Sequence, residues 1–309
     1  MKKKLILVFL VLFIIALATI VIFKEFNSVQ SSAKPDADLS FAVLSDIHGN
    51  EGNLQNAIDD LYSVNSYMDA LVLNGDTVDQ GLDKQYDDIK DVLSKNSDKL
   101  PDTIIKNIGN HEYYDYDAEN ITEADVECRV NKYLEFAGTN KTYHDSWIKG
   151  YHFISLGSDY TGTEKVNAAL ISDEQLNWLR DTIKENYEEG KPIFVFLHQP
   201  IDMKFFNLNV KGVDKNEELK SILSNYPEVI LFTSHTHLTP DKSADEEKQI
   251  VTVNTGSVNS NYVTDINSEK GFVQDSSYSN GIYVEVKDNI VIIKARDFKS
   301  NTWIYSRML

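Results

Sequence analysis

Short apolar runs alternate along this chain with polar turns and with stretches of helical periodicity. Strands are expected at 39–44, 70–73 and 103–108, and an apolar run covers 151–156. The runs at 193–197 and 229–232 are continuously apolar, as buried central strands are. Between them the periodicity predicts helices at about 54–64, 86–93 and 172–187, the last starting at Ser172. Strands that alternate with helices in this way indicate a layered α/β domain.

The last third of the chain changes character. Its runs at 250–253, 281–286 and 290–295 are rich in valine and isoleucine, and Asp288-Asn289 suits a hairpin turn between the last two. We therefore expect the domain to finish in antiparallel strands.

Residues 113–150 are tyrosine-rich, acidic and only weakly periodic. They separate a polar strand-end motif from the next clear strand, so we expect them to form a small cap insertion beside the site. Within this segment, Tyr113, Tyr114 and Tyr116 either pack inside the cap or stack on a base or sugar of the substrate. His144 is either a surface histidine or touches the substrate from the cap.

The N-terminus predicts membrane attachment. Lys2, Lys3 and Lys4 precede an apolar run over residues 5–23, which as a helix spans roughly 28 Å, close to the thickness of the hydrocarbon layer. We expect residues 1–23 to be a transmembrane anchor or a signal sequence, 24–38 a polar tether and 39–309 the catalytic domain. The lysines should stay cytoplasmic, so the domain is expected on the extracytoplasmic side, or secreted if cleavage occurs near Ser31-Ser32-Ala33.

Composition narrows the partners. The formal net charge is −18, and such an acidic surface repels phosphate backbones, so we expect no nucleic-acid binding. The single cysteine, Cys128, excludes an intramolecular disulfide and a zinc cluster held by several thiolates. Nothing in the sequence indicates the oligomeric state.

Five polar motifs follow apolar runs and together hold five of the seven histidines. They are Asp46-Ile47-His48, Gly75-Asp76-Thr77-Val78-Asp79, Gly109-Asn110-His111-Glu112, His198 and His235-Thr236-His237. Polar residues that follow strands converge at one sheet edge, where open α/β folds bind ligands. We expect Asp46 and His48, two apart on an extended segment, to point to the same side. Mixed oxygen and imidazole donors suit manganese, iron or zinc, so the motifs indicate a two-metal hydrolytic site.

In this order the motifs resemble the calcineurin-like metallophosphoesterase superfamily. That family's pattern is D-x-H, G-D-x-x-D, G-N-H-[DE], a lone histidine and G-H-x-H, and the resemblance covers about residues 39–260. It implies a four-layer α-β-β-α sandwich. The family's glycine before H-x-H is Ser234 here, which should be tolerated unless the backbone there needs a positive φ.

The resemblance also implies roles. The metal ligands would be Asp46, His48 and His237 for one ion, Asn110, His198 and His235 for a second, and Asp76 as the bridge. By the same resemblance, two divalent or mixed-valence ions about 3.5–4 Å apart would share the hydroxide that attacks the ester. His111 would protonate the leaving oxygen or stabilise the transition state, and Asp79 would orient His111.

Other polar residues receive simpler interpretations. His152 lies in the apolar run 151–156 and is expected to pack as a strand histidine. Glu112 is expected to support the site without binding the metals. Asn50 either reaches the substrate or closes a turn.

We therefore predict two-metal-dependent hydrolysis of phosphate esters, by a phosphatase or a phosphodiesterase, with a small phosphate ester such as a nucleotide as substrate. The alternative is a catalytically weak metal-binding or interaction protein of the cell envelope with the same fold. That alternative predicts the loss of a ligand or of the His111 and Asp79 pair, and neither is lost.

Overall fold

The computed structural model describes residues 36–159, 167–205, 208–240, 250–265, 268 and 271–309. The predicted anchor at 1–23 and most of the tether at 24–38 lie outside these residues. Among the helices that are described, none has both the length and the apolar composition needed to cross a membrane.

The first of two large sheets has six strands. Their order across the sheet is β15 (Thr302–Met308), β14 (Ile290–Asp297), β13 (Asn280–Lys287), β1 (Leu39–Leu44), β2 (Ala70–Asn74) and β3 (Ile104–Asn107). β1, β2 and β3 are parallel, whereas β13, β14 and β15 are antiparallel to their neighbours. The predicted turn at Asp288-Asn289 joins β13 to β14, and both of its residues have positive φ, as hairpin turns require.

The second large sheet has five strands. Their order is β10 (Val251–Asn254), β9 (Val229–Thr233), β6 (Ile193–Phe196), β5 (Tyr151–Ser155) and β4 (His144–Ile148). β5, β6, β9 and β10 are parallel, and β4 is antiparallel to β5. The expectation that 250–253 is part of an antiparallel C-terminal sheet is therefore wrong. Valine and isoleucine favour a strand, but they do not specify the partner against which it pairs.

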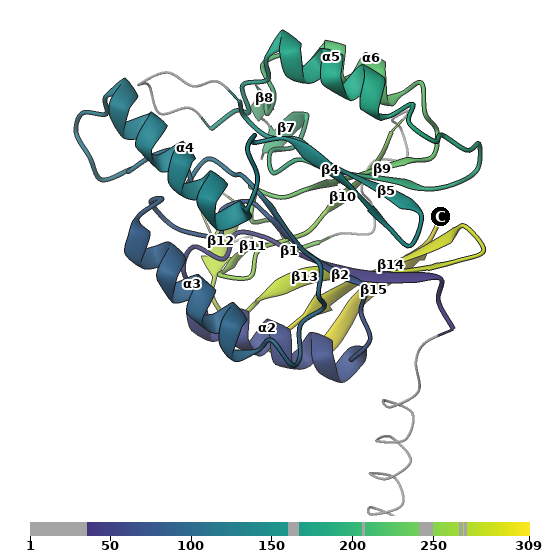
Figure 1. Ribbon diagram of the computed structural model, residues 1–309. Coiled ribbons are helices and arrows are strands. Elements are labelled where there is room, and N and C mark those ends of the chain that lie inside the picture. Colours follow the sequence, from purple (N-terminus) through teal and green to yellow (C-terminus); the bar gives the residue numbers. More distant parts are fainter. Residues whose placement is uncertain (1–35, 160–166, 206–207, 241–249, 266–267, 269–270) are drawn as a thin grey trace, which may run out of the picture.

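The two sheets pack face to face, and helices cover their outer faces (Figure 1). Alternate residues of β1 show this: Phe41 and Val43 lie in the core between the sheets, whereas Ala42 and Leu44 face the helices. The first sheet is covered by α2 (Glu51–Val64), α3 (Asp83–Lys95) and α4 (Glu123–Ala137), and the second by α5 (Asp173–Thr182) and α6 (Asn216–Leu223). The predicted α/β class is confirmed.

Residues 113–150 belong to these layers rather than to a separate cap. The segment contains α4, whose Val126, Tyr133 and Phe136 join the same core cluster as α2 and α3, and β4, the edge strand of the second sheet. Thr122 and Asp125 form a capping box that starts α4, and Gly138 ends it in the left-handed conformation. The expectation of a cap was wrong. Few apolar positions of α4 are buried, so the helical periodicity of its sequence is weak and the helix was not recognised.

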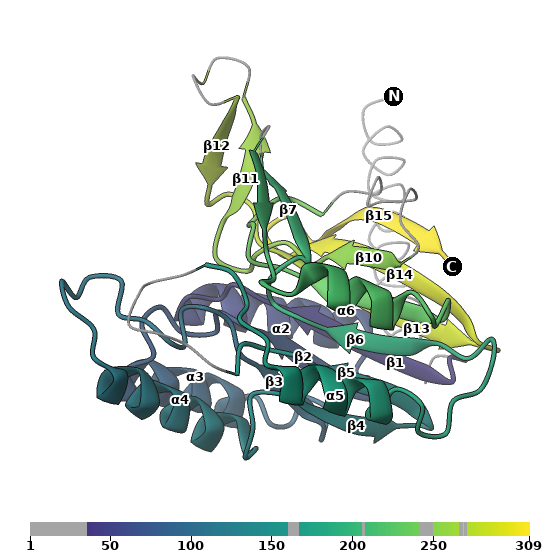
Figure 2. The same cartoon turned by 90° about the horizontal axis from the view of Figure 1, so that it is seen from above.

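Two small hairpins follow site motifs in the sequence. The first pairs β7 (Asp202–Phe205) with β8 (Leu208–Lys211), and the second pairs β11 (Asn261–Thr264) with β12 (Phe272–Asp275). Figure 2 shows β7, β11 and β12 projecting from the body of the two sheets. The second hairpin contacts the site, because the backbone N–H of Tyr262 donates to the carbonyl of His237 over 2.6 Å.

Candidate metal centre

All nine predicted site residues lie in loops that follow strands. Asp46 and His48 follow β1, Asp76 and Asp79 follow β2, Asn110 and His111 follow β3, His198 follows β6, and His235 and His237 follow β9. The site therefore draws from both large sheets. Contacts between their side chains connect these loops into one cluster.

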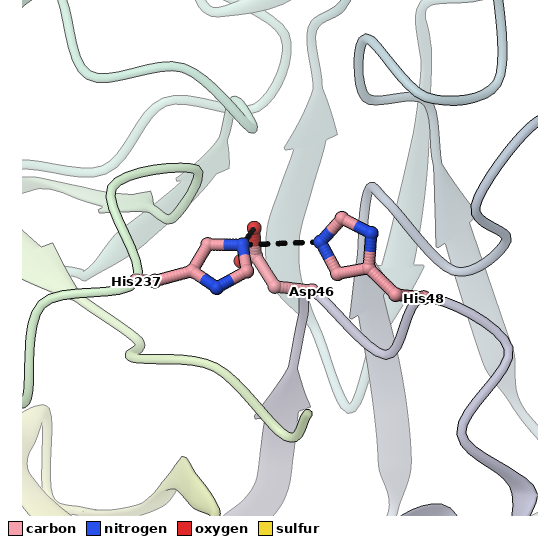
Figure 3. A group of neighbouring side chains, drawn as sticks. All are labelled: Asp46, His48 and His237. Carbon is pink, nitrogen blue, oxygen red and sulfur yellow. Dashed lines mark hydrogen bonds and ion pairs between the residues drawn. The ribbon is translucent and has the colours of Figure 1, made fainter. Parts of the chain in front are cut away.

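The first group consists of Asp46, His48 and His237 (Figure 3). The Nε2 atoms of His48 and His237 lie 3.0 Å apart, and Nε2 of His237 lies 3.0 Å from Oδ1 of Asp46. Nδ1 of His237 donates to the carbonyl of Ser260 over 3.1 Å, and Nδ1 of His48 lies 3.1 Å from the Asp79 carboxylate. Because each Nδ1 is used elsewhere, both rings direct Nε2 at the same point, as metal-binding histidines do.

The second group consists of Asp76, His198 and His235. Nδ1 of His198 donates to the carbonyl of Asn74 over 2.8 Å, and its Nε2 lies 3.0 Å from Oδ2 of Asp76. The ligand atoms of this group all lie within 4.8 Å of one another. Asn110 precedes His111, whose backbone N–H donates to Oδ1 of Asp76 over 2.9 Å. Oδ1 of Asn110 is buried and accepts no hydrogen bond from the residues that are described.

Electrostatics in the two groups favour a bound cation. Burial alone would raise the pKa of Asp46, but His237 and His198 outweigh it and lower that pKa to about 2. Burial would lower the pKa of His198, but Asp76 and Asp46 raise it to about 10. Without a metal ion, a proton on His198 therefore neutralises the buried carboxylates. Burial lowers the pKa of His235 to about 4, so this imidazole is neutral at pH 7.

The backbone of the site departs from the extended form that we expected around Asp46 and His48. Asp46, His48, Asp76, His235 and His237 all have positive φ, between 48° and 67°. They make up five of the ten non-glycine residues with positive φ in the described part of the chain. Left-handed backbone at such residues is strained, and strain of this kind gathers at functional sites. The convergence of Asp46 and His48 comes from this loop geometry, not from strand alternation.

Comparison with known proteins now decides the family. The family model of the calcineurin-like phosphoesterases matches residues 39–238. The chain belongs to the calcineurin-like phosphoesterase family. That match contains all nine predicted site residues.

Solved structures agree on the fold of this family member. It resembles the purple acid phosphatase PPD1 from yellow lupin (Lupinus luteus) seeds, with a TM-score of 0.61, 13% identity, and 87% of this chain and 53% of that chain covered. The chain thus spans about half the length of the lupin enzyme. It also resembles GAP50, the anchor in the inner membrane complex of Plasmodium, with a TM-score of 0.59, 15% identity and 88% of each chain covered. Among curated proteins none matches.

Two glycines of the family motifs stand where there is no space for a side chain. A Cβ at Gly75, whose φ is +89°, would lie 2.6 Å from Nδ1 of His198. A Cβ at Gly109 would overlap Asp76. These glycines therefore allow three site loops to approach one another closely.

Glu112 ties two of the site loops together. Its buried carboxylate accepts hydrogen bonds from the backbone N–H groups of Asp76 over 3.0 Å, Thr77 over 2.7 Å and Gly109 over 2.7 Å. Burial and the nearby Asp76 carboxylate raise the pKa of Glu112 to about 7. Glu112 thus supports the site by holding these two loops together, as expected from the sequence.

Asp79 contacts His111, although mainly through its backbone. Nδ1 of His111 donates to the backbone carbonyl of Asp79 over 2.7 Å and lies 3.7 Å from its carboxylate. That carboxylate is closer to His48, at 3.1 Å, and the hydrogen bond from His48 lowers the pKa of Asp79. Asp79 therefore holds His111, and its carbonyl rather than its carboxylate makes the closer contact.

Three further residues interpreted from the sequence have clear structural roles. Asn50 closes a turn: its side chain caps α2 by accepting from the N–H of Asn53, and it donates to Asn259. His152 is a packed strand histidine, stacked on Trp147 and 3.0 Å from the Asp145 carboxylate. Ser234 does not have a positive φ, so its side chain causes no strain there.

Several residues that the sequence did not single out support the site through their backbone. Carbonyls of Asn74 and Ser260 orient His198 and His237, and the N–H groups of Val258 and Asn259 donate to the carbonyls of Ser45 and Asp46. Every residue type except proline carries the same backbone groups, so the sequence contains no mark of these roles.

Proposed function

We propose that this chain is a two-metal phosphoesterase that hydrolyses small phosphate esters. One metal ion would be held by the first group, Asp46, His48 and His237, and a second by Asn110, His198 and His235, with Asp76 shared between them. The donors are oxygens and imidazole nitrogens, which suit manganese, iron or zinc. The order of the motifs and the family membership support this assignment.

One observation carries the proposal: the Nε2 atoms of His48 and His237 face each other at 3.0 Å beside an ionised carboxylate. Both Nδ1 atoms have oxygen partners, so in the neutral rings both Nε2 atoms present lone pairs. Two lone pairs and an anion at this separation require a proton or a cation between them. A divalent cation satisfies all three atoms at once.

The surrounding residues supply the rest of the chemistry. Two bound divalent ions polarise a phosphate ester and lower the pKa of water. His111 lies at the exposed side of the cluster, and because its Nδ1 donates to the Asp79 carbonyl, its Nε2 is the atom that holds or delivers a proton. That proton would pass to the leaving oxygen. The Asp79 carboxylate accepts a hydrogen bond from Nδ1 of His48. This bond keeps the imidazole in the tautomer that can bind a metal ion through Nε2.

We further propose that the domain works on the extracytoplasmic side of the cell membrane, anchored by residues 5–23. The support is in the sequence alone, namely the lysine cluster and the apolar run that follows it. The proposed substrate is a small phosphate ester such as a nucleotide, taken either as a monoester or as a diester.

A second function has an observation in its favour. The likeness to GAP50, an anchor in a membrane complex, makes a non-catalytic interaction protein a candidate. The complete set of predicted site residues argues against it, because an interaction protein needs neither a proton donor nor paired metal groups.

The test uses the full chain, purified in detergent without chelator. Metal content would be measured together with hydrolysis of p-nitrophenyl phosphate and bis(p-nitrophenyl) phosphate, with added manganese and with chelator. We expect about two metal ions per chain and chelator-sensitive turnover, and the preferred ester chooses between phosphatase and phosphodiesterase. Asp46→Asn should lose metal, whereas His111→Ala should keep metal and lose activity, most of all on poor leaving groups.

His152→Gln serves as the matched control, since His152 packs on Trp147 away from the two groups. Metal binding without turnover of either ester would support the interaction protein. A purified chain that binds no metal would refute both the metal assignment and the enzyme.

A further inference from the structure

Tyr116 lies in the turn between β3 and α4 and contacts two of the proposed functional residues. Its hydroxyl accepts a hydrogen bond from Nδ2 of Asn110 over 2.8 Å. Its ring centroid lies 4.5 Å from that of His111, with 35° between the ring planes. From the sequence, Tyr116 was expected only to pack inside a cap or to stack on the substrate. Tyr113 and Tyr114, by contrast, are buried in the core.

The hydroxyl determines which end of the Asn110 amide faces the site. It donates to Oδ1 of Asn167 over 3.4 Å, so its hydrogen points away from Asn110 and its oxygen is available as an acceptor. Only the NH₂ end of Asn110 can satisfy that acceptor. The other end, Oδ1, is the buried oxygen that accepts no hydrogen bond within the described residues.

That orientation matters for a metal ion. An amide oxygen binds a divalent cation, whereas an NH₂ group facing the same point would repel it. Reversal of the amide would require the Tyr116 hydroxyl to give up Asn167 and to donate to Oδ1 of Asn110 instead. A single hydroxyl therefore favours the orientation that offers oxygen to the metal.

The ring acts on His111. Nδ1 of His111 is fixed by the Asp79 carbonyl, and the tilted Tyr116 ring packs against one side of the imidazole. These two contacts restrict rotation of the imidazole, so its Nε2 keeps one direction. Tyr116 thus contacts a proposed metal ligand through its hydroxyl and the proposed proton donor through its ring.

We propose that Tyr116 is a positioning residue of the metal centre, setting the amide orientation of Asn110 through its hydroxyl and the direction of His111 through its ring. The proposal rests on the proposed function. It assigns the hydroxyl to metal affinity and the ring to proton transfer, and two substitutions separate these roles.

Tyr116→Phe removes the hydroxyl and keeps the ring, whereas Tyr116→Leu removes both. The control is Tyr187→Phe, which deletes a hydroxyl that bonds Glu228 on the surface. Manganese binding by the full chain would be measured by competition with a chelator, and kcat on aryl phosphates with good and poor leaving groups at saturating manganese. We expect Tyr116→Phe to weaken one of the two manganese equivalents about tenfold or more, as is typical when a partner of a metal ligand is lost.

With metal restored, Tyr116→Phe should show near-normal kcat. Tyr116→Leu should in addition lose kcat, more on poor than on good leaving groups. Manganese binding by Tyr116→Phe equal to that of the wild type, or equal weakening of both equivalents, would overturn the proposal while leaving the proposed function standing. A wild-type chain that binds no manganese would instead overturn the proposed function, and the role of Tyr116 with it.

Discussion

The left-handed backbone at the site leads to a stability prediction. Asp46, His48, Asp76, His235 and His237 have φ between 48° and 67°. Each left-handed non-glycine residue costs roughly 1–2 kcal/mol, so five of them cost on the order of 5–10 kcal/mol. The metal-free domain should contain this strain without compensation from bound ions. Relieving it at one position should then stabilise the metal-free protein.

His235, with φ of +67°, is the position to test. His235→Gly and His235→Ala both remove the imidazole, so their difference reports on the backbone. In the left-handed conformation alanine is destabilised by about 1–2 kcal/mol. Glycine avoids this cost, but the greater conformational freedom of its unfolded chain lowers the stability of the folded protein by about 0.5–1 kcal/mol. We expect His235→Gly to be more stable than His235→Ala by about 1 kcal/mol.

The assay is thermal unfolding in chelator, followed by circular dichroism. For a chain of this size about 1 kcal/mol corresponds to a shift of roughly 2 °C in Tm. The control is the same pair of substitutions at His198, which does not have a positive φ. There alanine should be the more stable by about 0.5–1 kcal/mol. Alanine at 235 as stable as glycine, or the same preference at both positions, would refute the strain argument.

Three further predictions concern protonation, a buried ion pair and a glycine. The pKa of His198 is about 10 without metal, so metal binding at pH 7 should release about one proton. Metal affinity should therefore increase about tenfold for each unit by which the pH is raised, up to about pH 10. Calorimetry in two buffers measures both quantities. Asp60→Asn breaks the buried pair with Arg296 (2.7 and 2.8 Å) and should cost about 3–5 kcal/mol in thermal unfolding, without loss of metal. Gly109→Ala should purify with little metal, whereas Gly52→Ala, where a Cβ meets only one atom at 3.8 Å, should keep it.

The strands of the core could be predicted from the sequence because they are buried on both faces. β1 was located at both ends, and β6 and β9 to within one residue, since a short continuous apolar run is typical of such a strand. Strands whose side chains are largely exposed were not predicted. β15 is exposed along most of its length, so it lacks the apolar run that marked the others. The helix expected over 172–187 starts after Ser172 as predicted but ends at Thr182.

The site was predicted as a set of side chains, and the structure brings that set together. The sequence placed carboxylate, amide and imidazole side chains after strands, and the parallel strands of both sheets bring such loops to one edge. What the sequence lacked was the means of convergence, namely left-handed loops, close glycine contacts and carbonyls that fix each imidazole. These features depend on contacts with loops that follow other strands, so they cannot be predicted from the local sequence.

Ser234 shows how a departure from the family pattern can strengthen the site. Its hydroxyl oxygen accepts from Nδ2 of Asn74 over 2.9 Å and lies 2.8 Å from Oγ1 of Thr255, and all three residues are buried. Asn74 belongs to the first sheet and Ser234 follows a strand of the second, so this bond joins the two sheets. The carbonyl of Asn74 also fixes His198. A glycine at 234 would remove the shortest hydrogen bond of the Asn74 amide and leave only those to the carbonyls of Leu197 and Phe232, at 3.5 and 3.4 Å. A hydrogen bond of this kind contributes about 0.5–1.5 kcal/mol. Each of the two metal groups contains residues from both sheets, so the distances within each group depend on how the sheets are held together. Ser234 stabilises that contact between the sheets.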